Sequence, residues 1–149
     1  MHKLALSLCL LASLAGCASA PAPATYGSFV EAPNAADDKT MADDAVKRLT
    51  ALYPPARTRF NLQHATPDGF GGNLVTELRT KGYALAEVKP GAQPMAPAAG
   101  EQSLAYVIDQ PLDPGMYRVT IFINSQSLSR VYQPVSGELK AAGPWLRKE

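Results

Sequence analysis

Apolar residues recur at the spacing of a helix in two segments of the chain. In the first segment, residues 40–53, they fall three or four positions apart, and Pro54 and Pro55 stop the pattern. Thr40, with Asp43 three residues later, predicts the N-cap of this helix. The apolar positions are Ala42, Ala45, Val46, Leu49 and Leu52.

The second helical pattern lies in TPDGFGGNLVTELRTKG. Glu77 and Lys81, one turn apart, are predicted to pair, and Gly82 predicts a left-handed cap. Two starts are compatible with the sequence: Thr66 at the front, or Asn73 after the three glycines. The apolar face consists of Phe70, Leu74, Val75 and Leu78.

The segments between and after these helices have the patterns of strands. Residues 57–63 alternate between apolar and polar positions, residues 83–88 form a short strand, and longer alternating runs follow at 103–109 and 116–124. The turn NSQS then leads into LSRVYQ. The pattern predicts a small single α+β domain, with an αβαβ half, a three-stranded antiparallel meander and helices on one sheet face.

Proline and glycine break up the C-terminal tail. One short edge hairpin fits before Trp145, because regular structure is interrupted at Pro134, Gly137, Gly143 and Pro144. Because tryptophans are usually mostly buried, we expect Trp145 to cover the edge of the core.

The N-terminus has the order of a secretory signal, with a basic start, an apolar middle and small residues. The mostly apolar run from Leu4 to Ala15 has twelve residues, whereas a helix needs about 20 to cross a bilayer. It ends in LAGC, which resembles the bacterial lipobox. The resemblance implies that residues 1–16 are a lipoprotein signal peptide and that Cys17 receives fatty acids such as palmitate. Ala18 instead of aspartate implies an outer-membrane lipoprotein facing the periplasm.

Residues 17–39, rich in alanine and proline, have few large apolar side chains. We interpret them as a lipidated cysteine with a flexible tether, and residues 40–149 as the globular periplasmic domain. Within the tether, YGSFV brings together Tyr26, Phe29 and Val30. These residues are either an incidental apolar spot or a short anchor that docks on a partner, since aromatic residues dominate interface hot spots.

The mature chain offers little for catalysis or metal binding. His64 is its single histidine, and acylation of Cys17 leaves no free thiol. No GxSxG elbow accompanies His64 and Asp68, and the glycines at 69–72 lack the ending of a phosphate-binding loop. We therefore expect no enzyme activity, cofactor, metal or small-molecule substrate.

The charge balance argues against nucleic acid as a partner. Loss of Lys3 with the signal leaves 13 of the 14 basic residues against 13 acidic ones. The acidic pairs Asp37–Asp38 and Asp43–Asp44 are expected at the end of the tether and in the first helical turn, where they favour solubility and complement the helix dipole.

Four segments in the same order resemble the TrbH family, the lipoproteins of P-type conjugative transfer systems. They are the lipobox, YGSFVEAP, LYPPARTRFNLQ and SQSLSRVYQPVSGELKAAGPWLRKE. The resemblance implies a component of a type IV secretion apparatus for mating-pair formation, at the outer membrane beside the TrbG-type pore subunit, without catalytic residues. The stretch RFNLQHATPDGF, with LVTELRTKGYAL after it, is similar to the strand–helix–strand start of secretin and TonB short N-terminal domains.

The leading hypothesis is a structural role in conjugal transfer. Cys17 fixes the protein to the outer membrane, and Tyr26, Phe29 and Val30 dock on the pore subunit. The alternative is a free binding or exclusion lipoprotein that faces the periplasm and recognises an envelope ligand or an incoming mating apparatus.

Overall fold

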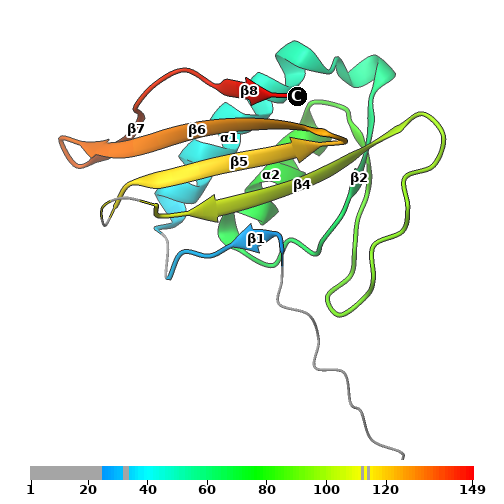
Figure 1. The fold of residues 1–149 in the computed structure, drawn as a ribbon, viewed down its shortest axis with the longest axis horizontal. Coiled ribbons are helices and arrows are strands. Elements are labelled where there is room, and N and C mark those ends of the chain that lie inside the picture. Colours follow the sequence, from blue (N-terminus) through cyan, green and yellow to red (C-terminus); the bar gives the residue numbers. More distant parts are fainter. Residues whose placement is uncertain (1–24, 32–33, 112, 114) are drawn as a thin grey trace, which may run out of the picture.

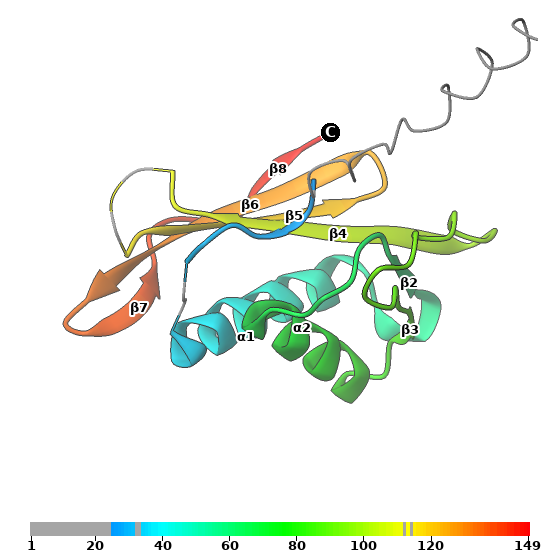
Figure 2. The same ribbon diagram turned by 90° about the horizontal axis from the view of Figure 1, so that it is seen from below.

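Two helices cover one face of a mixed sheet. The computed structural model describes residues 25–31, 34–111, 113 and 115–149. Helix α1 (Ala35–Leu52) packs against helix α2 (Gly69–Thr80), and both lie on the same side of the sheet (Figures 1 and 2). A 3₁₀ turn, Pro55–Arg57, follows α1. The predicted small α+β domain is confirmed.

The sheet is parallel on one side of β4 and antiparallel on the other. In the described residues its strands are β1 (Gly27–Ser28), β2 (Arg59–Leu62), β3 (Ala84–Ala86), β4 (Glu101–Asp109), β5 (Tyr117–Ile123), β6 (Gln126–Val135), β7 (Glu138–Ala141) and β8 (Leu146–Lys148). The main order is β3-β2-β4-β5-β6-β7. Strands β3, β2 and β4 run parallel, and β4 to β7 form antiparallel pairs.

One side of β4 and one side of β6 are each paired with two short strands. β2 pairs with the first half of β4, and β1 pairs in parallel with Val107 and Ile108 further along the same strand. In the same way, β7 pairs with the end of β6, and β8 pairs with its beginning. The N- and C-terminal parts of the described chain therefore complete the sheet.

The core lies between the helices and the inner sheet face. Strand β5 shows the alternation clearly, because its odd-numbered residues are buried and its even-numbered residues are half-buried. The largest fully buried side chains include Tyr106, Tyr132, Phe60 and Phe70. Trp145 packs on this core as predicted.

Both predicted hairpins are present in the described chain. Residues 124 and 125 connect β5 to β6, with Asn124 in the left-handed region at φ 52°. Ser136 and Gly137 connect β6 to β7 with φ values of 54° and 83°. Because two-residue hairpins favour positive φ, asparagine and glycine at these positions fit the turns.

The beginning of α1 differs from the prediction. The helix begins at Ala35, and its N-cap is Asn34, whose side chain accepts a hydrogen bond from Ala36 N–H at 2.9 Å. Thr40 is inside the helix, where its hydroxyl donates to the Ala36 carbonyl at 2.9 Å. The expected boundary between residues 39 and 40 therefore lies within α1, and β1 is formed by residues assigned to the tether.

None of the helices in the described part of the chain is long and apolar enough to cross a membrane. The expected signal peptide and Cys17 lie outside the described residues.

Candidate functional site

The start of α2 is a buried polar cluster formed by residues from α1, α2 and β4. Asp68 caps the helix, because its Oδ1 accepts a hydrogen bond from Gly71 N–H at 2.9 Å. Its Oδ2 accepts a hydrogen bond from the Tyr106 hydroxyl at 2.6 Å. Burial and this bond raise the pKa of Tyr106, so the phenol stays protonated and donates.

Two glycines make room for this cluster. A Cβ atom at Gly69 would overlap the Asp38 carboxylate, and one at Gly71 would overlap the Tyr106 hydroxyl. With Asp68 as its N-cap, the helix begins at Gly69, between the two starts that the sequence allows. Gly82 has φ 89°, as expected for the predicted left-handed cap.

Asp38 is buried in the first turn of α1, beside the start of α2. The residue is 3% exposed, and its Oδ1 has no hydrogen-bond partner among the described residues. Burial, followed by the nearby carboxylates of Asp68 and Asp37, raises the pKa of Asp38 to about 6. Ionisation of Asp38 therefore lowers the stability of the fold. The sequence pattern predicted a solvated acidic pair and did not indicate this burial.

His64 continues the hydrogen bonding of the sheet beyond β2. Its Nδ1 lies 2.8 Å from the Ala65 carbonyl, so this nitrogen carries the proton, because a carbonyl can only accept. Its Nε2 accepts from Tyr106 N–H at 3.3 Å. Burial lowers the pKa of His64, which agrees with a neutral ring. Both ring nitrogens are occupied, so this imidazole has no free lone pair for proton transfer.

Asp44 joins α1 to the last strands of the sheet. Its Oδ2 accepts from Arg130 Nη1 at 2.7 Å, from the Tyr132 hydroxyl at 2.7 Å and from Trp145 Nε1 at 3.1 Å. The prediction placed this residue in the first helical turn, as a group for solubility. The helix begins at Ala35, so Asp44 lies well inside it. Its side chain faces β6 and Trp145 and joins the C-terminal segment to α1.

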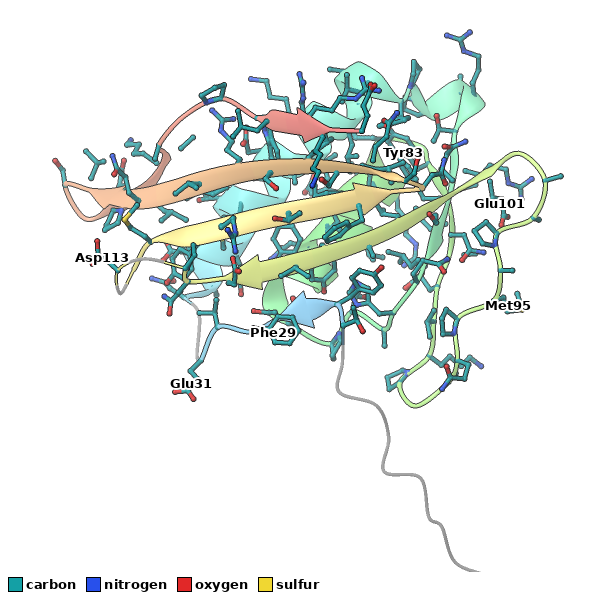
Figure 3. The ribbon with its side chains drawn as sticks, viewed as in Figure 1. Phe29, Glu31, Tyr83, Met95, Glu101 and Asp113 are labelled. Atoms are coloured by element: carbon teal, nitrogen blue, oxygen red, sulfur yellow. The ribbon has the colours of Figure 1, made fainter. Side chains whose placement is uncertain are left out.

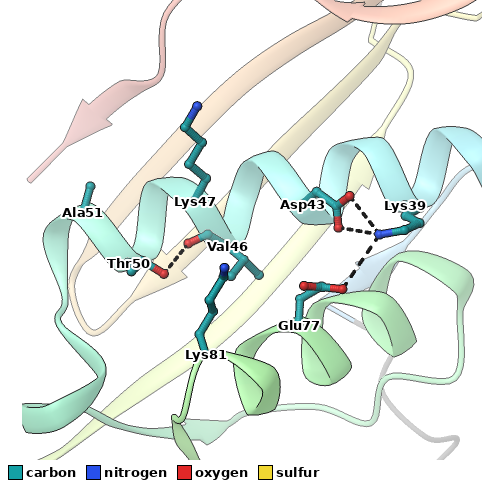
Figure 4. A pocket seen from close by; sticks show the side chains of 8 residues that line it. All are labelled: Lys39, Asp43, Val46, Lys47, Thr50, Ala51, Glu77 and Lys81. Atoms are coloured by element: carbon teal, nitrogen blue, oxygen red, sulfur yellow. Dashed lines mark hydrogen bonds and ion pairs between the residues drawn. The ribbon is translucent and has the colours of Figure 1, made fainter.

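A groove of about 530 Å³ runs between the exposed sides of α1 and α2 (Figure 4). Lys39 lies 2.8 Å from Asp43 and 3.8 Å from Glu77, so it connects the two helices. Glu77 therefore pairs with Lys39, and not with Lys81 as predicted. Among the described residues, no group of three or more histidine, cysteine or acidic side chains could hold a metal ion.

The three predicted docking residues have different surroundings. Tyr26 stacks on His64, with 5.7 Å between ring centroids, and lies 5.6 Å from the ring of Phe122. Val30 is partly buried against the core. Phe29 is 54% exposed, although its backbone N–H donates to the Ile108 carbonyl at 2.8 Å (Figure 3).

A second hollow, of about 660 Å³, lies where the described chain begins. It is bounded by β1, by the segment from β2 to α2, and by the loop that follows β3. Tyr26, His64 and Asp68 lie on one side, and residues 90–94 lie on the other.

The fold and these contacts define a two-layer α+β domain in which the buried polar side chains connect helices to strands. A family model described as conjugal transfer protein TrbH matches residues 23–149. The match includes every described residue, and the protein therefore belongs to the TrbH family of conjugal transfer proteins. Comparison with curated proteins and with solved structures gave no significant match.

Proposed function

We propose that this protein is an outer-membrane lipoprotein that serves as a structural component of a conjugative type IV secretion apparatus. Membership of the TrbH family, over residues 23–149, is the observation that carries this proposal. The polar clusters around Asp68 and Asp44 support a structural role, because their groups bond to one another and connect elements of the domain.

The lipid anchor of the proposal is Cys17 at the end of LAGC. Each buried CH₂ of an acyl chain is worth about 0.8 kcal/mol, so two or more chains suffice for stable attachment. Metabolic labelling with radioactive palmitate should mark the wild-type protein and leave Cys17→Ser unlabelled. Equal labelling of both proteins would contradict the anchor.

We assign docking on the TrbG-type pore subunit to residues 26–30, which include β1, and among them to Phe29. The aromatic ring of Tyr26 already packs on the protein's own His64 and Phe122. Phe29 combines a large exposed side chain with a backbone that is hydrogen-bonded to β4. A pre-ordered aromatic group loses little conformational entropy on binding, which suits a contact residue.

The docking test is co-purification of the pore subunit with Phe29→Ala. We expect recovery of the pore subunit to fall at least several-fold, while Val135→Ala, which alters an apolar residue exposed at 41%, should leave it unchanged. Undiminished recovery with Phe29→Ala would remove this contact. Deletion of the whole Tyr26–Val30 segment is a less specific test, because β1 also covers the edge of β4.

Fractionation after gentle detergent extraction separates this function from its alternative. A structural component should sediment with the large secretion assembly in a constant ratio to the pore subunit. Recovery of the acylated protein only as a free membrane lipoprotein would favour a binding or exclusion lipoprotein. Full conjugal transfer by His64→Ala would speak against catalysis by the single histidine of the mature chain.

A further inference from the structure

The loop between β3 and β4 is unusual in composition and exposure. Residues 90–100, PGAQPMAPAAG, contain no charged side chain, and every one of them is exposed. Met95, which lies well out on the loop, is 74% exposed (Figure 3). No charged group within residues 90–100 would therefore lose its hydration if the loop contacted a less polar surface.

The loop begins with a local turn, and its end is attached to β2. Near its start, Ala92 N–H donates to the Lys89 carbonyl at 3.0 Å. At its end, Glu101 Oε2 accepts from Ala98 N–H at 3.0 Å and from Asn61 Nδ2 at 3.1 Å. The nearest charges in the sequence, Lys89 and Glu101, flank the loop. Met95 lies apart from Glu101 (Figure 3), and it lines a small hollow together with Lys89 and Glu87.

The loop adjoins the point where the chain from the anchor reaches the domain. Tyr26 and Gly27 line the same hollow as Pro90 and Pro94. The hairpin between β6 and β7, which follows Val135, is at the opposite end of the molecule (Figures 1 and 2). The loop therefore lies closer to the first described residues than the β6–β7 hairpin does.

The length of chain before β1 limits how far this end can be from the membrane. Cys17 and Tyr26 are nine residue steps apart, which even a fully extended chain spans in about 30 Å. Because Tyr26 is packed on His64 and Phe122, the domain cannot gain reach without breaking these contacts. At this end, residues 90–100 can approach a bilayer without removing a charge of their own from water, while Lys89 beside Met95 can keep its ammonium group among the lipid head groups.

We propose that the loop at residues 90–100 lies against the lipid bilayer that holds Cys17, with Met95 at its contact surface. This inference rests on the proposed function, because it requires the anchor at Cys17. The short connection to Cys17 and this contact together orient the domain on the membrane, and they leave the helices and the β6–β7 hairpin directed toward other proteins.

The test uses a thiol-reactive fluorophore in the full-length protein, acylated in cells and reconstituted into phosphatidylethanolamine–phosphatidylglycerol vesicles. An acylated Cys17 leaves no other thiol in the mature chain, so Met95→Cys can be labelled at a single position. Val135→Cys is the matched control at the far end. We expect lipids that carry a nitroxide at the head group to quench the label at position 95 at least two-fold more than the label at position 135.

Radioactive palmitate in the same preparations reports on the anchor separately. Acylated protein with equal quenching at positions 95 and 135 would overturn the membrane contact while the anchor stands. Protein without fatty acid at Cys17 would refute the anchor, and with it this inference. Greater quenching at position 95 in acylated protein supports both.

Discussion

At the scale of single residues, the least expected feature is the ionisable group buried in the first turn of α1. Asp38 is placed where the positive ends of two helices meet, which favours a negative charge. Burial and the carboxylates of Asp68 and Asp37 act in the opposite direction and prevail, since the pKa of Asp38 is raised. The raised pKa of Asp38 cannot be predicted from the sequence pair Asp37–Asp38, because it depends on the packing of α2 over the first turn of α1.

The raised pKa of Asp38 predicts a specific pH dependence of stability. The pKa of Asp38 is about 6 in the folded protein against 3.8 for an unperturbed aspartate, so the folded state binds the proton more tightly than the unfolded state. The resulting contribution is fully present below about pH 4 and is lost as the pH rises through 6. Asp38→Asn should therefore raise the free energy of unfolding by about 2–3 kcal/mol at pH 7.5 and change it little at pH 4.

Urea denaturation of wild type and Asp38→Asn at both pH values tests this prediction. Burial lowers the pKa of His64, but this residue is present in both proteins, so its contribution cancels in the difference. An equal difference in the free energy of unfolding at pH 4 and pH 7.5 would show that Asp38 is not the titrating group.

The glycines at the start of α2 give a second prediction at this scale. Gly69→Ala should lower the free energy of unfolding by about 1–3 kcal/mol, because the new Cβ meets the Asp38 carboxylate. Gly72 is also helical but has open space at its Cβ position. Gly72→Ala is the matched control and should be stabilising by about 0.5–1 kcal/mol. Thermal unfolding of the two variants compares them, and similar midpoints would contradict the close approach at Gly69.

At the scale of elements, one carboxylate joins helix α1 to the last part of the sheet and to Trp145. Asp44 accepts hydrogen bonds from Arg130, Tyr132 and Trp145. Asp44→Ala should lower the free energy of unfolding by about 2–4 kcal/mol, because it leaves these partly buried donors without their acceptor. It should also shift the fluorescence emission of Trp145, the only tryptophan, to longer wavelength.

The neighbouring acid provides the control for Asp44→Ala. Asp43 pairs with Lys39 on the helix surface, where both side chains are about half exposed. Asp43→Ala should cost no more than about 0.5 kcal/mol and leave the tryptophan emission unchanged. Equal emission spectra for the two variants would show that Asp44 does not hold Trp145 in place.

The elements that the sequence predicts well are those with enough residues to show a period. The apolar face of α2 and the alternation of β5 are examples, and both have the expected buried residues. The strands β1 and β8 have two and three residues, which is too short for any alternation. Their pairing depends on β4 and β6, so they are set by long-range contacts.

The candidate site was less predictable than the fold for a related reason. His64 and Asp68 stood out as isolated polar residues, but their roles depend on Tyr106, which is 38 residues beyond Asp68. Asparagine is a favoured N-cap residue, but the turn after Asn34 is polar and rich in alanine. No apolar periodicity therefore marks the start of a helix there. The exposed Phe29 is the one member of the predicted docking group whose side chain remains available for a partner.

At the scale of the whole molecule, the packing of β1 on β4 connects the fold to the proposed anchor. If β1 were not attached to the sheet, the first fixed point after Cys17 would be the start of α1 at Ala35. With β1 attached, nine residue steps remain between Cys17 and Tyr26, equivalent to about 30 Å at full extension. The attachment of a two-residue strand thereby sets the maximum height of the domain above the membrane.

This limit leads to a prediction about the segment between the anchor and β1. Duplication of residues 18–24 raises the separation from nine to sixteen residue steps, and the maximum reach from about 30 to about 55 Å. Because the domain would then be free to move away from the bilayer, we expect quenching of a fluorophore at Met95→Cys to fall toward the value at Val135→Cys. Palmitate labelling of Cys17 should not change. Quenching that stays high in the lengthened protein would mean that the loop at residues 90–100 has its own affinity for lipid, and that the short connection to Cys17 is not what brings it to the membrane.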